Sequence, residues 1–187
     1  KIISRDQTSL FGAFLDCCLH TPEGRRVPRC VLIGGESVVI IPVLTCREDK
    51  EIYTLMVQQR RIVDGDFSEE FPAGSIDLMM DDPQLTASQE LREELGMIVS
   101  SDELIPLGRK RVKTNPSYSD GLDSYFYFKK EVSLSYLQEL DGQQTGCRSD
   151  GEDIQVKVKK MSEVADCMTS SALIGVKLLE RELRCIF

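Results

Sequence analysis

A predicted helix with three glutamates on one face constrains this chain more than any other feature of its sequence. Asp82 and Pro83 match an N-cap and a first helical residue, and Gly96 stands where a glycine commonly ends a helix. One side of the helix must pack against a core, because apolar residues recur there every four positions. These are Ala87, Leu91 and Leu95.

The three glutamates are Glu90, Glu93 and Glu94, spaced so that they share a helix face. Like charges at these spacings destabilise a helix by roughly 0.2–0.5 kcal/mol per pair. Carboxylates in the last turn also face the negative end of the helix dipole. Either the cluster is a solvated charged surface, or a hard cation such as Mg²⁺ or Mn²⁺ offsets its repulsion.

Acidic charge is concentrated around this helix. The chain of 187 residues has a formal net charge of −8, and residues 64–94 hold ten of its 31 acidic residues but one of its 23 basic ones, Arg92. The rest of the chain is therefore nearly neutral. Because an acidic surface repels the phosphate backbone, we expect no nucleic-acid partner.

Apolar runs and cysteines indicate the compartment. The sequence has no run of 18 apolar residues, so we expect no transmembrane helix and no membrane partner. Its seven cysteines are an odd number without a Cys-x-x-Cys pair, and it has one histidine, which argues against a zinc finger and a disulfide framework. We expect a reducing intracellular compartment, the cytoplasm first, or an organelle if a leader preceded Lys1.

The periodicity of the chain predicts a mixed-sheet α/β or α+β sandwich, with strands on both sides of the glutamate helix and an amphipathic helix at 170–184. Pro42 lies within a buried-strand run at 36–44, where its missing N–H indicates an edge or a bulge. The other strands are expected at 8–20 and 28–33, around a turn at 21–24, and at 52–59, 123–129 and 153–159.

The stretch 74–97 (GSIDLMMDDPQLTASQELREELGM) resembles the Nudix box, G-x5-E-x7-R-E-U-x-E-E-x-G-U, in which U is aliphatic. It departs from that pattern in three ways. The first half is one residue longer, Asp81 or Asp82 stands at the mid-box Glu, and Gln89 replaces the Arg that orients the glutamates in the family. The second half matches at Glu90-Leu91, Glu93-Glu94 and Gly96-Met97.

The resemblance continues outside the box. Gln59-x-Arg61 and the run 70–74 (EFPAG) look like the Q-x-R…E-[LF]-P-A-G pattern of Nudix enzymes that cleave ADP-ribose and other nucleoside-diphosphate sugars. The stretch 114–121 is similar to the S-P-G-x-S-x-E loop of that branch, with Gly121 at its Glu. Residues 142–156 resemble the loop and strand that carry its late glutamate.

This resemblance implies a Nudix fold, in which a mixed sheet lies between helices, and a set of site residues. The general base maps to Glu152, while Glu93, Asp120 and Asp123 remain alternatives for that role. The implied catalytic residues are Glu93 and Glu152, the substrate-binding residues are Gln59, Arg61, Glu70 and Asp120, and the metal ligands are Ala73 through its carbonyl, Glu90, Glu93 and Glu94.

The implied function is hydrolysis of ADP-sugars, such as ADP-glucose or ADP-ribose, to AMP and a sugar phosphate with Mg²⁺ or Mn²⁺ as cofactor. A UDP-sugar pyrophosphatase, or a degenerate Nudix module that binds a nucleotide without cleaving it, remain alternatives.

The resemblance also implies two regions. Residues 1–36 form an N-terminal β extension that contributes to dimerisation and the substrate pocket, and residues 37–187 form the Nudix domain. Apolar residues in the extension must dock on something, since a two-stranded hairpin is marginal in water, so we expect a homodimer. The residues concerned are Leu10, Phe11, Phe14, Leu15, Leu32 and Ile33.

Overall fold

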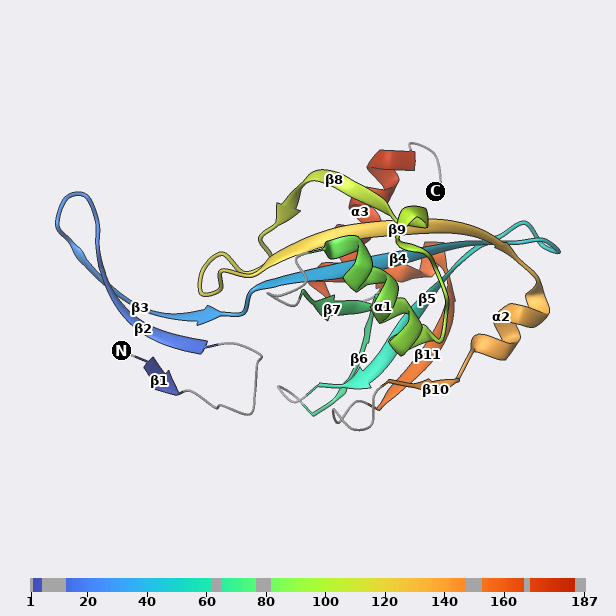
Figure 1. Ribbon diagram of the computed structural model, residues 1–187, viewed down its shortest axis with the longest axis horizontal. Coiled ribbons are helices and arrows are strands. Elements are labelled where there is room, and N and C mark those ends of the chain that lie inside the picture. The colour runs from blue at the N-terminus through green and yellow to red at the C-terminus, as the bar shows by residue number, and fades with distance from the viewer. Residues whose placement is uncertain are drawn as a thin grey trace.

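A mixed eight-stranded sheet separates two helical layers in the computed structural model, which describes residues 2–4, 13–61, 65–76, 82–146, 153–166 and 169–183 (Figure 1). The strand order is β10-β11-β5-β4-β9-β8, with β6 paired to β5 and β7 paired to β4. These neighbours are antiparallel except β4 and β9, which are parallel. The predicted α+β sandwich is confirmed.

The strands of this sheet are β4 (Glu36–Cys46), β5 (Ile52–Arg60), β6 (Phe67–Glu70), β7 (Ala73–Ser75), β8 (Ile105–Val112), β9 (Leu122–Val132), β10 (Gln144–Thr145) and β11 (Ile154–Lys160). The helices are α1 (Pro83–Leu95), α2 (Leu134–Leu140) and α3 (Ser170–Leu183), with short 3₁₀ turns η1 (Ser101–Glu103) and η3 (Met161–Asp166). None of the helices in the described part of the chain is long and apolar enough to cross a membrane.

The central strands β4 and β5 part in a fork, which β6 and β7 fill. They pair at Leu44 and Thr45, whereas β4 pairs with β7 at residues 37–39 and β5 pairs with β6 at residues 57–60. The N–H of Ile40 donates to the Pro72 carbonyl at 2.8 Å, so residues of even number in β4 direct their amides into the fork. Pro42 lies between the ladder with β7 and the ladder with β5, where an N–H group is not needed for strand pairing. This position explains how a central strand can contain a proline.

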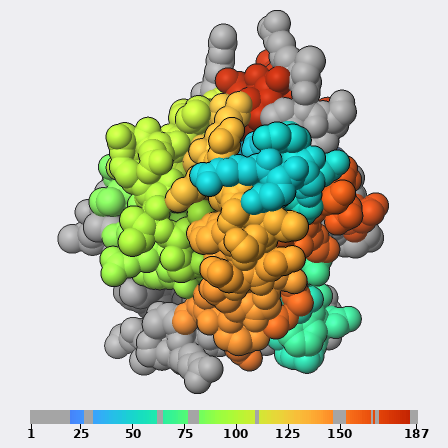
Figure 2. All heavy atoms as spheres, turned by 90° about the vertical axis from the view of Figure 1, so that its right-hand side faces the viewer, coloured from blue at the N-terminus to red at the C-terminus, as the bar shows by residue number. Residues whose placement is uncertain are grey.

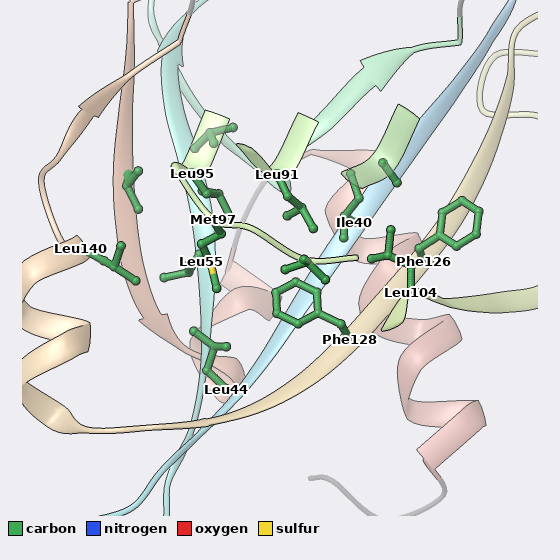
Figure 3. Close-up of a cluster of buried hydrophobic side chains, with 14 of the residues drawn as sticks. Ile40, Leu44, Leu55, Leu91, Leu95, Met97, Leu104, Phe126, Phe128 and Leu140 are labelled. Carbon is green, nitrogen blue, oxygen red and sulfur yellow. The ribbon is translucent and has the colours of Figure 1, made fainter. Parts of the chain in front are cut away.

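Alternating residues of β4 feed two separate cores on the two faces of the sheet. Val38, Ile40 and Leu44 pack with α1, and Figure 3 shows Leu91 and Leu95 of α1 directed into this cluster. Val39, Ile41 and Val43 pack with α3 on the other face.

The ends of α1 confirm the predicted caps. The Asp82 carboxylate accepts from the N–H groups of Gln84 and Leu85 at 3.0 and 3.2 Å. Gly96 adopts a left-handed φ of 64° and donates to the Arg92 carbonyl, while Met97 donates to Leu91. This arrangement is the hydrogen-bond pattern of a Schellman motif. The apolar positions Ala87, Leu91 and Leu95 are fully buried.

A second, three-stranded sheet precedes the main one and projects from the body of the molecule (Figure 1). It contains β1 (Ile2–Ser4), β2 (Ala13–His20) and β3 (Arg26–Ile33), in that order. The strand expected at 8–20 is present from residue 13 onward, and residues 8–12 lie outside the described part. The base of this sheet is bound to the loop before β9, because the Leu32 N–H donates to the Tyr118 carbonyl at 2.7 Å.

The opposite end of the molecule is closed by α2 and the turn between β4 and β5, which lie side by side (orange and cyan in Figure 2). The Glu48 carboxylate of that turn accepts from the N–H of Leu134 at 2.9 Å. The sheet that carries α1, β6 and β7 is thus fixed by hydrogen bonds at both ends of the molecule. One joins β3 to the loop before β9, and the other joins the β4–β5 turn to α2.

Candidate active site

The corner between β6 and β7 directs a backbone carbonyl toward the glutamate helix. Ala73 pairs with Val39 of β4. The hydrogen bond to β4 comes from the preceding residue, since the Pro72 carbonyl accepts from the Ile40 N–H, so Ala73 occupies a non-hydrogen-bonded position of the ladder. At such a position the N–H and C=O groups both point away from the partner strand. The Ala73 N–H does so, since it donates to Glu94 Oε2 at 2.9 Å. The Ala73 carbonyl is therefore directed to the same side.

Glu94 is the buried carboxylate of the site, with 5% of its surface exposed. A buried carboxylate requires hydrogen bonds or a cation, because desolvation penalises its charge. The Ala73 N–H supplies one of these interactions, so the position of one Glu94 oxygen is set by the backbone of β7.

Glu90 reaches the same corner one helical turn earlier. Its carboxylate occupies the place where a Cβ atom on Gly74 would stand. Such close contact with the backbone is available at a glycine and at no other residue type. The predicted ligands Ala73, Glu90 and Glu94 are thus brought together. The Glu94 carboxylate lies at the backbone of Ala73, and the Glu90 carboxylate lies at the backbone of the next residue, Gly74.

Glu93, the third glutamate, has an exposed side chain. Its backbone carbonyl is bound from outside the helix, since the Gly146 N–H donates to it at 3.2 Å. Glu93 therefore lies at the solvent side of the cluster.

The donors at this corner fit a hard cation in their chemistry, since carboxylate and carbonyl oxygens are the ligands that Mg²⁺ and Mn²⁺ prefer. Within the described ranges, no three His, Cys, Asp or Glu side chains converge as a ready-made metal cluster. The fit consequently rests on Glu90, Glu94 and the Ala73 carbonyl, a set of two carboxylates and one backbone oxygen.

Arg61 and Glu70 form a bidentate ion pair at the β5–β6 hairpin. Nε and Nη2 of Arg61 donate to the two Glu70 oxygens at 2.7 and 2.6 Å. Burial would raise the pKa of the Glu70 carboxyl, but the hydrogen bond and positive charge of Arg61 outweigh it and hold the pKa below its ordinary value. Glu70 is therefore ionised at neutral pH, and 47% of the Arg61 side chain is exposed to meet an anion.

Gln59 lies on the same sheet face as α1. It is two residues beyond Val57, which packs in the core beneath α1. Glu70 pairs with Val57 across the ladder and so shares this face. Three of the predicted substrate-binding residues, Gln59, Arg61 and Glu70, thus belong to the hairpin next to the corner at Ala73.

Asp120 and Asp123 lie apart from this group. The Asp120 carboxylate accepts from the Gly34 N–H at 2.9 Å and connects the loop before β9 to the end of β3. Asp123 accepts from the Ser37 hydroxyl at 2.7 Å, and its position in β9 places it on the α3 face of the sheet. The predicted base Glu152, like Asp77 and Asp81, lies outside the described residues.

Sequence reasoning did not identify two contributors to the site. The motif begins at Gly74, but its pattern does not show that this residue makes room for the Glu90 carboxylate. The hydroxyl of Thr145 donates to the Glu94 carbonyl at 2.5 Å across 51 residues of sequence, for which no local pattern gives a signal.

Three comparisons with known proteins show what this chain is similar to. The NUDIX domain family model matches residues 36–172. Nudix hydrolase 14, chloroplastic, of Arabidopsis thaliana is 29% identical over 142 residues, which cover 72% of this chain and 45% of that protein. The chain thus spans less than half the length of this relative.

A solved structure described as a crystal structure of ADP compounds hydrolase superposes with a TM-score of 0.69, at 16% identity, over 98% of this chain and 91% of that one. The likeness at this identity concerns the fold, and it includes the sheet, α1 and the N-terminal strands within its coverage. Because the family model spans most of the chain and includes the whole glutamate corner, the chain belongs to the Nudix family.

Proposed function

We propose that the chain hydrolyses the diphosphate bond of ADP-sugars, such as ADP-glucose or ADP-ribose, to AMP and a sugar phosphate, with Mg²⁺ or Mn²⁺ as cofactor. The observation that supports this most directly is the convergence of Glu90 and Glu94 on the backbone of Ala73 and Gly74. A diphosphate is an anion and needs positive charge to approach carboxylates, and these oxygens are suited to hold a divalent cation that supplies it.

The residues that would hold the cation are Glu90, Glu94, the Ala73 carbonyl and, on its solvent side, Glu93. A bound Mg²⁺ or Mn²⁺ supplies Lewis-acid charge to the phosphoryl oxygens. The Ala73 N–H keeps one oxygen of Glu94 in place, so the second oxygen is presented in a fixed direction.

The reaction needs a proton acceptor near the diphosphate. Water forms a bond to one phosphorus, the bond from that phosphorus to the bridging oxygen breaks, and a carboxylate accepts the proton of the water. We assign this role to Glu152, with Glu93 as the alternative because its side chain is exposed beside the cluster. Asp123 is a weaker candidate, since it lies on the α3 face of the sheet.

The β5–β6 hairpin is suited to bind the substrate. Arg61 offers a guanidinium whose planar donors match phosphate oxygens. Glu70 holds that guanidinium through two hydrogen bonds, so the side chain is oriented before substrate arrives. Gln59 adds a neutral amide on the same sheet face.

A panel of nucleotide sugars tests the proposal. We expect AMP to be released from ADP-glucose and ADP-ribose with Mg²⁺ or Mn²⁺, measured by chromatography, and to disappear with a chelator. Glu90→Gln should lose the activity while remaining folded. Release of UMP from UDP-sugars at a higher kcat/KM would assign the UDP-sugar alternative instead.

The second candidate is a Nudix module that binds a nucleotide without cleaving it. Gln89 favours this function, because a neutral amide replaces the arginine of the box. If the wild-type chain is inert with every nucleotide sugar and Gln89→Arg does not restore turnover, the binding function is the correct one.

The assembly and compartment are also proposals. We propose a homodimer formed through residues 1–36, with the Nudix domain in residues 37–187. We further propose a reducing intracellular compartment, on the basis of the odd number of cysteines. The relative from Arabidopsis thaliana is described as chloroplastic.

A further inference from the structure

The last turn of α1 carries two of the three glutamates, and a helix end has carbonyls without intrahelical partners. The two residues that directly follow the helix supply donors near this end, because Gly96 and Met97 donate to the carbonyls of Arg92 and Leu91. The carbonyls of Glu93 and Glu94 are the next two along the chain.

Those two carbonyls are bound by one segment that is distant in sequence. The Thr145 hydroxyl donates to the Glu94 carbonyl at 2.5 Å, and the Gly146 N–H donates to the Glu93 carbonyl at 3.2 Å. A segment about 50 residues later in the sequence therefore fixes the backbone of both glutamates.

This segment is itself fixed to the sheet. Thr145 pairs with Ile154 in the β10–β11 ladder, and Ile154 pairs with Gln59 of β5. Ile154 is fully buried in the core that also contains Leu95. The hydroxyl of Thr145 is thus presented to α1 by paired backbone.

The two donors also have an electrostatic effect. The carboxylates of Glu93 and Glu94 lie at the negative end of the helix dipole, which disfavours them. Donors that bind the terminal carbonyls place partial positive charge at this end, so they offset part of that penalty and hold the turn in a helical conformation.

We propose that Thr145 is a positioning residue, whose hydroxyl, together with the Gly146 N–H, fixes the last turn of α1 so that Glu93 and Glu94 are held in the geometry that binds the cation. This inference rests on the proposed function. Thr145 acts through the backbone of Glu94 and does not touch the substrate.

Thr145→Val tests the inference, because valine keeps the shape and removes the hydroxyl. We expect Mn²⁺ affinity, measured by titration calorimetry without substrate, to weaken about tenfold, as for other partners of metal ligands. The kcat at saturating Mn²⁺ should fall while KM for the nucleotide sugar stays within about twofold, since the hairpin at Arg61 is unchanged. Thr145→Ser restores the donor and should restore the Mn²⁺ affinity.

Thr86→Val is the matched control. The Thr86 hydroxyl donates to the Asp82 carbonyl at 3.1 Å, so this variant loses the same type of bond at the other end of α1. We expect it to lower the melting temperature as Thr145→Val does, without changing Mn²⁺ affinity. Hydrogen exchange adds a readout without catalysis: the Gly146 and Gly96 amides should exchange about fivefold faster in Thr145→Val and not in Thr86→Val.

The outcomes separate the inference from the proposed function. If the wild-type chain binds Mn²⁺ and cleaves, but Thr145→Val matches Thr86→Val in Mn²⁺ affinity and kcat, Thr145 has a purely structural role and the inference is wrong. If the wild-type chain binds no Mn²⁺, the metal-dependent function and the inference are both wrong. A tenfold loss of affinity that serine restores supports the inference, whereas release of AMP by the wild-type chain supports the proposed function.

Discussion

The carboxylate of Glu90 occupies the space in which a Cβ atom on Gly74 would stand. Glycine is needed here because of this close approach to the backbone. Gly74, the first glycine of the motif, and Glu90, its first glutamate, are separated by 16 positions and are thus in direct contact. This contact brings a helix carboxylate beside the backbone that also presents the Ala73 carbonyl.

Gly74→Ala should separate stability from activity. The methyl group must displace the end of the Glu90 side chain, which is flexible, so we expect the free energy of unfolding to change by less than about 1 kcal/mol. Turnover of the ADP-sugar should fall about 100-fold, because the ligand no longer holds its position. Gly34→Ala is the control, since a Cβ there meets ordinary contacts at 3.9 Å or more. Full activity in Gly74→Ala would show that Glu90 is not a ligand.

Glu94→Gln should remove most of the activity and leave the fold intact. The amide oxygen of glutamine can still accept from the Ala73 N–H, so the backbone contact survives. Without metal the variant should be as stable as the wild type or slightly more stable, because a buried charge and a like-charge repulsion are lost. Melting curves with and without Mn²⁺ measure this; a wild-type turnover number in the variant would contradict the metal assignment.

Gln89→Arg should raise metal affinity or turnover. Position 89 lies four residues before Glu93 on an exposed part of α1, so an arginine there can pair with that carboxylate. Orientation of the glutamates by a charged partner is worth more than the helix pairing alone, which contributes roughly 0.3–0.5 kcal/mol. Mn²⁺ titration of both proteins checks the prediction, and an unchanged affinity together with unchanged kcat counts against it.

The Arg61–Glu70 pair predicts a pH dependence of stability. The pKa of Glu70 in the folded chain lies below its ordinary value of 4.5, so the unfolded chain takes up the proton first as the pH falls. The stabilisation is complete above about pH 4.5 and is lost as the pH drops through the folded pKa. For a partly exposed pair it amounts to about 0.5–1 kcal/mol.

Melting temperatures of the wild type and Glu70→Gln should therefore differ by a constant amount from pH 8 to about pH 5 and converge below pH 4.5. A difference that persists undiminished at pH 3 would mean that Glu70 stabilises the fold through packing and not through its charge.

Local signals explain which elements could be predicted from the sequence. Both ends of α1 are determined by residues within one turn, Asp82 and Pro83 at the start and Gly96 at the end, so the predicted limits are correct. The short strands β6 and β7 are not among the strands that the sequence predicts, because the run at 71–74 contains a proline and a glycine. Their strand conformation is imposed by the fork between β4 and β5, which is a tertiary feature.

Two further elements were missed for different reasons. β8 contains Gly108 with a φ of 78° and a register shift after Leu107, so its alternation of apolar residues is broken. α2 is short, at seven residues, and its N-cap Ser133 was a usable signal. The glutamates were found through the resemblance to a motif, whereas the contact between Thr145 and Glu94 depends on the pairing of β10 with β11, which no local pattern encodes.

The N-terminal sheet of β1, β2 and β3 is expected to join two copies of the chain. Figure 1 shows β2 and β3 projecting from the body of the molecule, and Ile33 at the end of β3 is 36% exposed. Three strands with apolar sequence on such a projection need a partner surface. We expect a symmetric homodimer with an apolar interface of more than about 2,000 Å² in total, as obligate pairs have.

Light scattering at micromolar concentration should give about twice the 21.1 kDa mass of one chain. Deleting residues 1–33 should then dissociate the dimer and also raise KM, because it removes Leu32, whose N–H donates to the Tyr118 carbonyl and whose carbonyl accepts from the Asp120 N–H. Ile33→Asp serves as a milder variant, since it places one charge in the expected interface and keeps the strands. A full-length chain that is monomeric and fully active would contradict the predicted dimer and show that the N-terminal sheet does not serve in assembly.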